Sequence, residues 1–176
     1  MRVFGQDETR LGLHLPIPRR LTGYGVKPIQ VVEPLYEYSW LSAAVEPPTG
    51  DAFWWEWPRL DAACFSVFLR QLSQHSAESL NIVLLDQAPA HVAQRVEVPE
   101  NVILLWLPAY SPELNPVERL WEDLKRRIDV LNGQVRSNLS ALQEHVAGLV
   151  QRYSAEMIAS LTGYAYLVEA IDALQF

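Results

Sequence analysis

The sequence is short of cysteine, of long apolar runs and of positive charge. Its single cysteine, Cys64, excludes a disulfide framework and a cysteine-based zinc site, and favours a reducing, cytoplasmic setting. No run approaches the roughly 18 apolar residues of a membrane helix, and the first residues lack the apolar core of a signal peptide. The net charge of −7 argues against a protein that coats nucleic acid by bulk electrostatics. An enzyme acting on nucleic acid remains allowed, because local charge decides such binding.

The sequence does contain enough apolar residues to form one packed core. The chain has 176 residues, of which 49% are hydrophobic, as expected for a globular protein of one domain. We expect this domain to span residues 1–176, with C-terminal helices from about residue 137.

Hydrophobic patterning predicts an α/β domain with a mixed sheet. Strands are expected over 2–8, 29–32 with 35–45, 52–57, 81–86 and 102–107. Helices are expected from an Asp61 cap to residue 74, over about 89–95, and from 117 to 131 with Asn132–Gly133 as the C-terminal cap. Further helices are expected around Ser140–Gln143 to about 152, and from a Ser154 cap to 173 with a break near Gly163.

Three acids follow predicted strands. Asp7 and Asp86 end their strands, and Glu118 lies in the first turn of the helix after the 102–107 strand. Ligand sites of open α/β sheets gather at the carboxyl ends of strands. Three carboxylates brought to one edge bind hard divalent cations, and two ions about 4 Å apart promote phosphodiester cleavage.

Each acid also has a plain structural interpretation. Asp7 is equally consistent with a solvated strand end, and Asp86 with an Asx turn that accepts hydrogen bonds from the next residues. Glu118 has the strongest such alternative. Asn115, Pro116 and Glu118 stand where an N-cap, a first-turn proline and a dipole-compensating acid belong. Taken alone, that stretch favours capping.

Two motifs change this balance. Residues 86–91 read DQAPAH and residues 107–118 read LPAYSPELNPVE. They resemble the catalytic core of mariner-like bacterial insertion-sequence transposases of the DDE superfamily. That family carries Asp-Asn-Ala-x-x-His and Pro-x-Tyr-Ser-Pro-x-Leu-Asn-Pro-[Ile/Val]-Glu segments, after a strand ending Asp-Glu that residues 6–10, QDETR, match.

The resemblance implies an RNase H-like fold, a five-stranded mixed sheet flanked by helices. It implies that Asp7, Asp86 and Glu118 are the catalytic, metal-binding acids, with two Mg²⁺ or Mn²⁺ ions as cofactors. The implied activity is DNA cleavage at the ends of an insertion sequence, followed by attack of the freed 3′ hydroxyl on target DNA. It also implies DNA as the partner, a homodimer, no membrane, and a bacterial cytoplasm with nucleoid association.

Two departures accompany the resemblance. Gln87 stands where the family has Asn. The first catalytic strand begins within a few residues of Met1, so we expect the family's N-terminal helix-turn-helix region to be absent. Two explanations stay open: the chain is the second reading frame of a two-frame element, or it is a truncated remnant.

Four further residues are candidates for DNA contact, namely Arg10, His91, Arg119 and Lys125. The cations flank the acids and suit phosphate binding, although a solvated helix face explains Lys125 at least as well. Capping or packing is the alternative for His91. Two other functions stay open: an inactive or domesticated transposase remnant with a binding or assembly role, and another RNase H-like nuclease.

Overall fold

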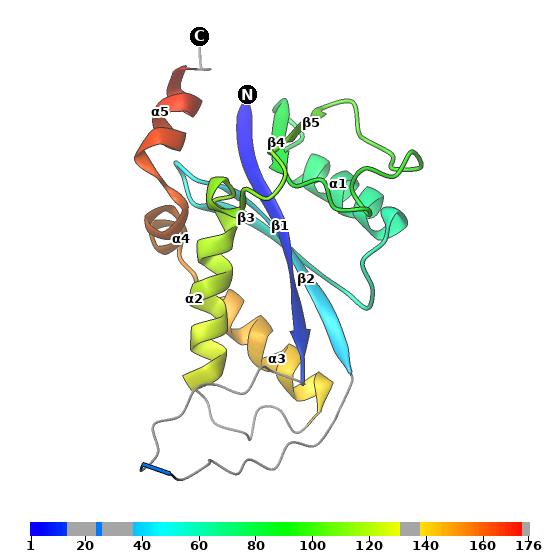
Figure 1. Ribbon diagram of the computed structural model, residues 1–176. Helices are drawn as coiled ribbons and strands as arrows, with labels where there is room; N and C mark the ends of the chain where they lie inside the picture. The colour runs from blue at the N-terminus through cyan, green and yellow to red at the C-terminus, as the bar shows by residue number, and fades with distance from the viewer. Residues whose placement is uncertain (14–23, 26–36, 131–137, 174–176) are drawn as a thin grey trace.

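A five-stranded mixed sheet forms the centre of the computed structural model (Figure 1), which describes residues 1–13, 24–25, 37–130 and 138–173. The strands are β1 (Arg2–Gly12), β2 (Tyr38–Glu46), β3 (Asp51–Trp57), β4 (Asn81–Leu85) and β5 (Val102–Trp106), in the order β3-β2-β1-β4-β5. Strands β1, β2 and β3 pair antiparallel, whereas β4 pairs parallel to both β1 and β5. The mixed sheet that the sequence predicts is confirmed.

Helices cover both faces of the sheet. On one face, α1 (Ala62–His75) buries Phe65, Phe68 and Leu69 against Phe4 and Val83. On the other face lie α2 (Val117–Val130), α3 (Leu139–Val150), α4 (Ala155–Thr162) and α5 (Ala165–Ala173). None of the helices in the described ranges combines the length and hydrophobicity that crossing a bilayer requires.

The caps of three helices bear on the sequence predictions. Asp61 and Ser154 cap α1 and α4 as predicted, and the last helical stretch is divided at Gly163. The cap of α3 is Asn138, whose Oδ1 accepts the Ala141 N–H at 2.8 Å, and residues Ser140–Gln143 lie inside this helix, as predicted.

Two predicted elements differ from the structure. Strand β1 continues to Gly12 instead of ending at Glu8, because β2 pairs with it from Gly5 onward. The helix expected over 89–95 is wrong: this segment forms isolated turns, and His91 is drawn inward by polar contacts. The predicted strand at 29–32 and the cap at Asn132–Gly133 lie outside the described residues.

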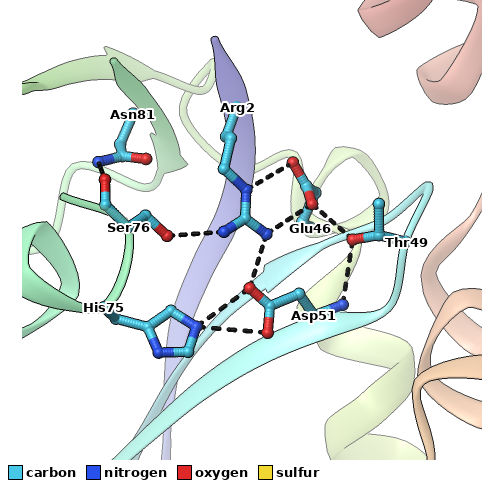
Figure 2. Close-up of polar contacts among 7 residues, drawn as sticks. All are labelled: Arg2, Glu46, Thr49, Asp51, His75, Ser76 and Asn81. Atoms are coloured by element: carbon cyan, nitrogen blue, oxygen red, sulfur yellow. Dashed lines mark hydrogen bonds and ion pairs between the residues drawn. The ribbon is translucent and has the colours of Figure 1, made fainter. Parts of the chain in front are cut away.

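A polar cluster around Arg2 fixes the N-terminal ends of β1 and β4 (Figure 2). The Arg2 guanidinium donates to Glu46 at 2.6 Å, Asp51 at 2.6 Å and the Ser76 hydroxyl at 2.7 Å. His75 contacts the same Asp51 carboxylate at 3.0 Å. This half-buried cluster joins β1, the β2–β3 hairpin and the end of α1, and leaves the opposite end of β4 to the predicted acids.

Candidate active site

Asp7 and Asp86 lie at one level on neighbouring parallel strands. The last paired residues of β1 and β4 are Gly5 and Leu84. Asp7 lies two residues further along β1, and Asp86 follows directly after β4 ends at Leu85. Neighbouring strands of a sheet lie about 5 Å apart, so the two acids stand at the same edge of the sheet. Asp7 is therefore not at the end of its strand, as the sequence suggested, but at the point where β1 extends beyond β4.

The start of α2 is fastened directly to the strand that carries Asp7. The Asn115 Nδ2 donates to the Gln6 carbonyl at 2.9 Å, while its Oδ1 accepts the Val117 N–H at 3.1 Å. Pro116 packs where a side chain on Gly5 would be, since a Cβ there would approach the Pro116 Cγ to 2.4 Å. These contacts place Glu118, in the first turn of α2, beside β1.

All three acids line one cleft of about 500 Å³. Its other walls are the turn after β4, at Gln87 and Ala88, and the segment 107–112 after β5. On its rim Tyr110 is fully exposed and has a φ of 59°, a left-handed conformation that is uncommon for residues other than glycine. The structure thus brings the three predicted acids to a shared surface.

Negative charge accumulates around Asp7. Burial raises its pKa, the nearby charges of Glu118, Glu8 and Asp86 raise it further, and the result is a pKa of about 7. The indole N–H of Trp121 donates to the Asp7 Oδ2 at 3.0 Å, which orients the carboxylate without neutralising it. A carboxyl surrounded by other carboxylates is the electrostatic condition that a bound cation relieves.

The chemistry of these donors fits a hard divalent cation. Carboxylate oxygens are the ligands that Mg²⁺ and Mn²⁺ prefer. Within the described residues, however, no three His, Cys, Asp or Glu side chains already converge on one metal position.

Behind the cleft lies a second layer of contacts. His91, with 2% of its surface exposed, places Nδ1 2.9 Å from the Asp86 Oδ1 and Nε2 3.1 Å from the Glu8 Oε2. Burial alone would lower the pKa of His91, but the hydrogen bond with Glu8 and the charges of Glu8 and Asp86 raise it overall. His91 therefore has no free face for DNA, and its contacts favour the packing alternative.

The three basic candidates lie outside the cleft lining. The guanidinium of Arg10 lies 4.7 Å from the Tyr38 ring centroid, and that of Arg119 lies 4.8 Å from the Tyr164 ring centroid. Lys125 is exposed two helical turns after Glu118. Gln87 reaches across the cleft floor, where its Nε2 donates to the Leu107 carbonyl at 3.1 Å and joins the ends of β4 and β5.

The sequence interpretation missed Glu8, Trp121 and Tyr110 as parts of the site. Trp121 lies in the helix expected over 117–131 but was not among the candidate site residues, although a buried indole N–H normally needs a partner. Glu8 followed Asp7 on the opposite face of the strand, and no spacing linked it to His91. For Tyr110 no signal in the sequence indicated the left-handed backbone.

The chain and its fold match a known class of proteins. The DDE superfamily endonuclease family matches residues 6–140, and the chain belongs to that family. The match confirms the class that the motifs at 86–91 and 107–118 predicted. The chain is also 34% identical over 89 residues to the uncharacterized protein y4pE/y4sA of Sinorhizobium fredii (strain NBRC 101917 / NGR234), covering 50% of this chain and 66% of that protein.

Among solved structures, the fold is similar to that of the Mos1 mariner transposase. The Mos1 paired-end complex with the left transposon end matches with a TM-score of 0.68 and 18% identity, over 92% of this chain and 51% of that one. The Mos1 mariner paired-end complex with Mn matches with a TM-score of 0.69 and 18% identity, over 92% of this chain and 52% of that one. The RNase H-like fold is confirmed, and this chain spans about half the length of the Mos1 chains it matches.

Proposed function

We propose that this chain is the catalytic domain of a DDE transposase, which cuts DNA at the ends of an insertion sequence and joins the freed end to target DNA. One observation carries the proposal. Asp7, Asp86 and Glu118 come from separate parts of the chain and line one cleft, within the residues that match the DDE superfamily endonuclease family.

In this proposal the three carboxylates hold two divalent cations. Bound Mg²⁺ or Mn²⁺ supplies Lewis acidity, which activates an attacking water or hydroxyl and stabilises the leaving oxygen of the phosphodiester. The chain's own groups prepare that site. Trp121 orients the Asp7 carboxylate, Asn115 sets the start of the helix that bears Glu118, and the raised pKa of Asp7 reflects charge that a cation would balance.

DNA would approach along the open side of the cleft. The ring of Tyr110 is exposed on the rim and available for stacking on a base, which is sequence-tolerant. Arg10, Arg119 and Lys125 would contact phosphates further from the cleft, where single cations position the backbone. We expect the active form to be a homodimer.

A cleavage assay with a matched pair of variants tests the proposal. Glu118→Gln removes a cleft carboxylate, whereas Glu113→Gln removes an exposed carboxylate five residues earlier, outside the cleft lining. With Mn²⁺ and DNA carrying element ends, we expect Glu118→Gln and Asp86→Asn to lose cleavage by at least about 100-fold, because removed metal ligands are not replaced. We expect Glu113→Gln to cleave like the unaltered chain.

Two results would redirect the proposal. Cleavage that survives Asp86→Asn would refute the role of the carboxylates. An unaltered chain that binds Mn²⁺ and DNA without cutting would favour the binding or assembly role, and preferential cleavage of RNA or branched DNA would favour another RNase H-like nuclease.

A further inference from the structure

A buried chain of polar contacts links β1 to the turn after β4. Glu8, on β1, and His91 are both almost inaccessible, with side chains 5% and 1% exposed, whereas the Asp86 side chain is 57% exposed. The His91 ring lies between them, with one nitrogen on each carboxylate. The contacts therefore run from the protein interior outward to a carboxylate that faces the cleft.

The two oxygens of Asp86 are not equivalent. Oδ1 faces the His91 Nδ1 at 2.9 Å and also accepts the backbone N–H of Ala88 at 3.0 Å. Among the described residues, nothing donates to Oδ2. The Asx turn predicted as the plain structural alternative for Asp86 is thus present, yet it occupies the same oxygen as His91 and leaves the other one available.

The Glu8 end of this series of polar contacts is held in place by the sheet and α1. Glu8 accepts the Gln6 side-chain amide at 2.7 Å and the Ser42 hydroxyl at 3.4 Å. The His91 ring packs 4.4 Å from the Phe65 ring centroid, which restricts its rotation. With Glu8 fixed and the ring confined, the Nδ1 position is determined before any ligand arrives.

We propose that His91, anchored by Glu8, is a positioning residue that holds Asp86 Oδ1 and so directs Oδ2 at the cation in the cleft. The inference rests on the proposed function, because it presumes that Asp86 is a metal ligand. Partners that orient a ligating side chain typically contribute 10- to 100-fold to metal affinity. If His91 were purely structural, it would only hold the 86–91 turn against β1. Its replacement would then lower metal affinity only as far as it lowers the stability of the protein.

Two amide side chains of different length separate these roles. In His91→Asn the side-chain NH₂ occupies the place of Nδ1 and still donates to Asp86, but the contact with Glu8 is lost. In His91→Gln the NH₂ extends toward the place of Nε2, keeping Glu8 and losing Asp86. Both variants remove the same ring from the same Phe65 contact, so thermal unfolding without metal should report similar stability losses.

Mn²⁺ affinity, measured by isothermal titration calorimetry on the folded chain without DNA, is the readout. We expect His91→Asn to bind Mn²⁺ within about threefold of the unaltered chain and His91→Gln to bind about tenfold more weakly. His75→Asn is the matched control, because it removes another His–Asp contact, 3.0 Å from the Asp51 Oδ2, at the opposite end of β4. We expect it to leave the affinity unchanged.

The outcomes are distinct. Equal Mn²⁺ affinity in the two amide variants, whether unchanged or reduced in proportion to stability, would overturn the positioning role and leave the proposed function intact. An unaltered chain that binds no Mn²⁺ at millimolar concentration would overturn the proposed metal site, and this inference with it.

Discussion

Replacing Asp7 with asparagine should stabilise the metal-free protein at high pH. The pKa of this carboxyl rises from 3.8 to about 7, first through burial and then through the charges of Glu118, Glu8 and Asp86. At about 1.4 kcal/mol per pH unit, ionising Asp7 in the folded state costs up to about 4 kcal/mol. Asp7→Asn removes that cost and keeps an acceptor for the Trp121 indole N–H.

The sign of the pH dependence follows from proton binding. Between pH 4 and pH 7 the folded protein holds a proton on Asp7 that the unfolded chain has lost, so stability falls as pH rises through this window. We expect Asp7→Asn to match the unaltered chain near pH 4.5 and to exceed it by about 2–4 kcal/mol at pH 8. Urea denaturation at the two pH values, with EDTA present, measures the difference.

Asp123 provides a control of opposite sign. It is buried, which alone would raise its pKa, but hydrogen bonds from Tyr153, Arg127 and Arg126 lower that pKa to about 2. Its stabilising contribution is therefore present above pH 4 and lost as pH falls toward 2, so Asp123→Asn should destabilise the protein at pH 8. A destabilising Asp7→Asn, or a stability difference independent of pH, would refute the reasoning about Asp7.

Two other predictions concern backbone geometry around the cleft. Tyr110→Gly should relieve a left-handed backbone strain of about 1–2 kcal/mol, offset by about 0.5–1 kcal/mol for the added entropy of the unfolded chain. The free energy of unfolding should therefore rise slightly in Tyr110→Gly and stay unchanged in Tyr110→Ala. Equal free energies of unfolding in the two variants would contradict the strain. Gly5→Ala should destabilise by about 1–3 kcal/mol and weaken Mn²⁺ binding, because its Cβ would overlap Pro116. Gly148→Ala, in α3 with open space around the new Cβ, should be neutral or stabilising in the same urea experiment. A similar loss of stability in Gly5→Ala and Gly148→Ala would contradict the predicted overlap with Pro116.

The parts of the fold that the sequence predicted are those with a local cause. Strand β4 appears as a continuous apolar run because most of it is buried, whereas the equally apolar β5 leaves Ile103, Leu105 and Trp106 exposed. Asp61 and Ser154 cap helices through contacts within three residues. The family motifs then pointed to the three acids. No periodic pattern in the sequence could connect them, because 111 positions separate Asp7 from Glu118.

The parts that the sequence did not predict depend on contacts between distant segments. Residues 9–12 lie beyond the strand end expected at Glu8, yet pairing with β2 keeps β1 extended, and Glu8 is satisfied by Gln6, Ser42 and His91. The segment 89–95 has helical composition but forms turns, since His91 lies between two carboxylates that belong to other elements. Partners 83 residues apart leave no periodic signal.

The start of α2 shows why capping and a role in the active site are compatible for one stretch of sequence. The Oδ1 of Asn115 caps the helix, while the Nδ2 of the same side chain donates to the carbonyl of the residue before Asp7. An aspartate there would cap equally well but could not donate, so the amide is required by the link to β1 and not by the helix. Pro116 then packs on Gly5, two residues before Asp7. The cap therefore sets where the helix begins and also where the Glu118 carboxylate lies relative to the Asp7 carboxylate. As a result, Glu118 can both compensate the helix dipole and face the cleft.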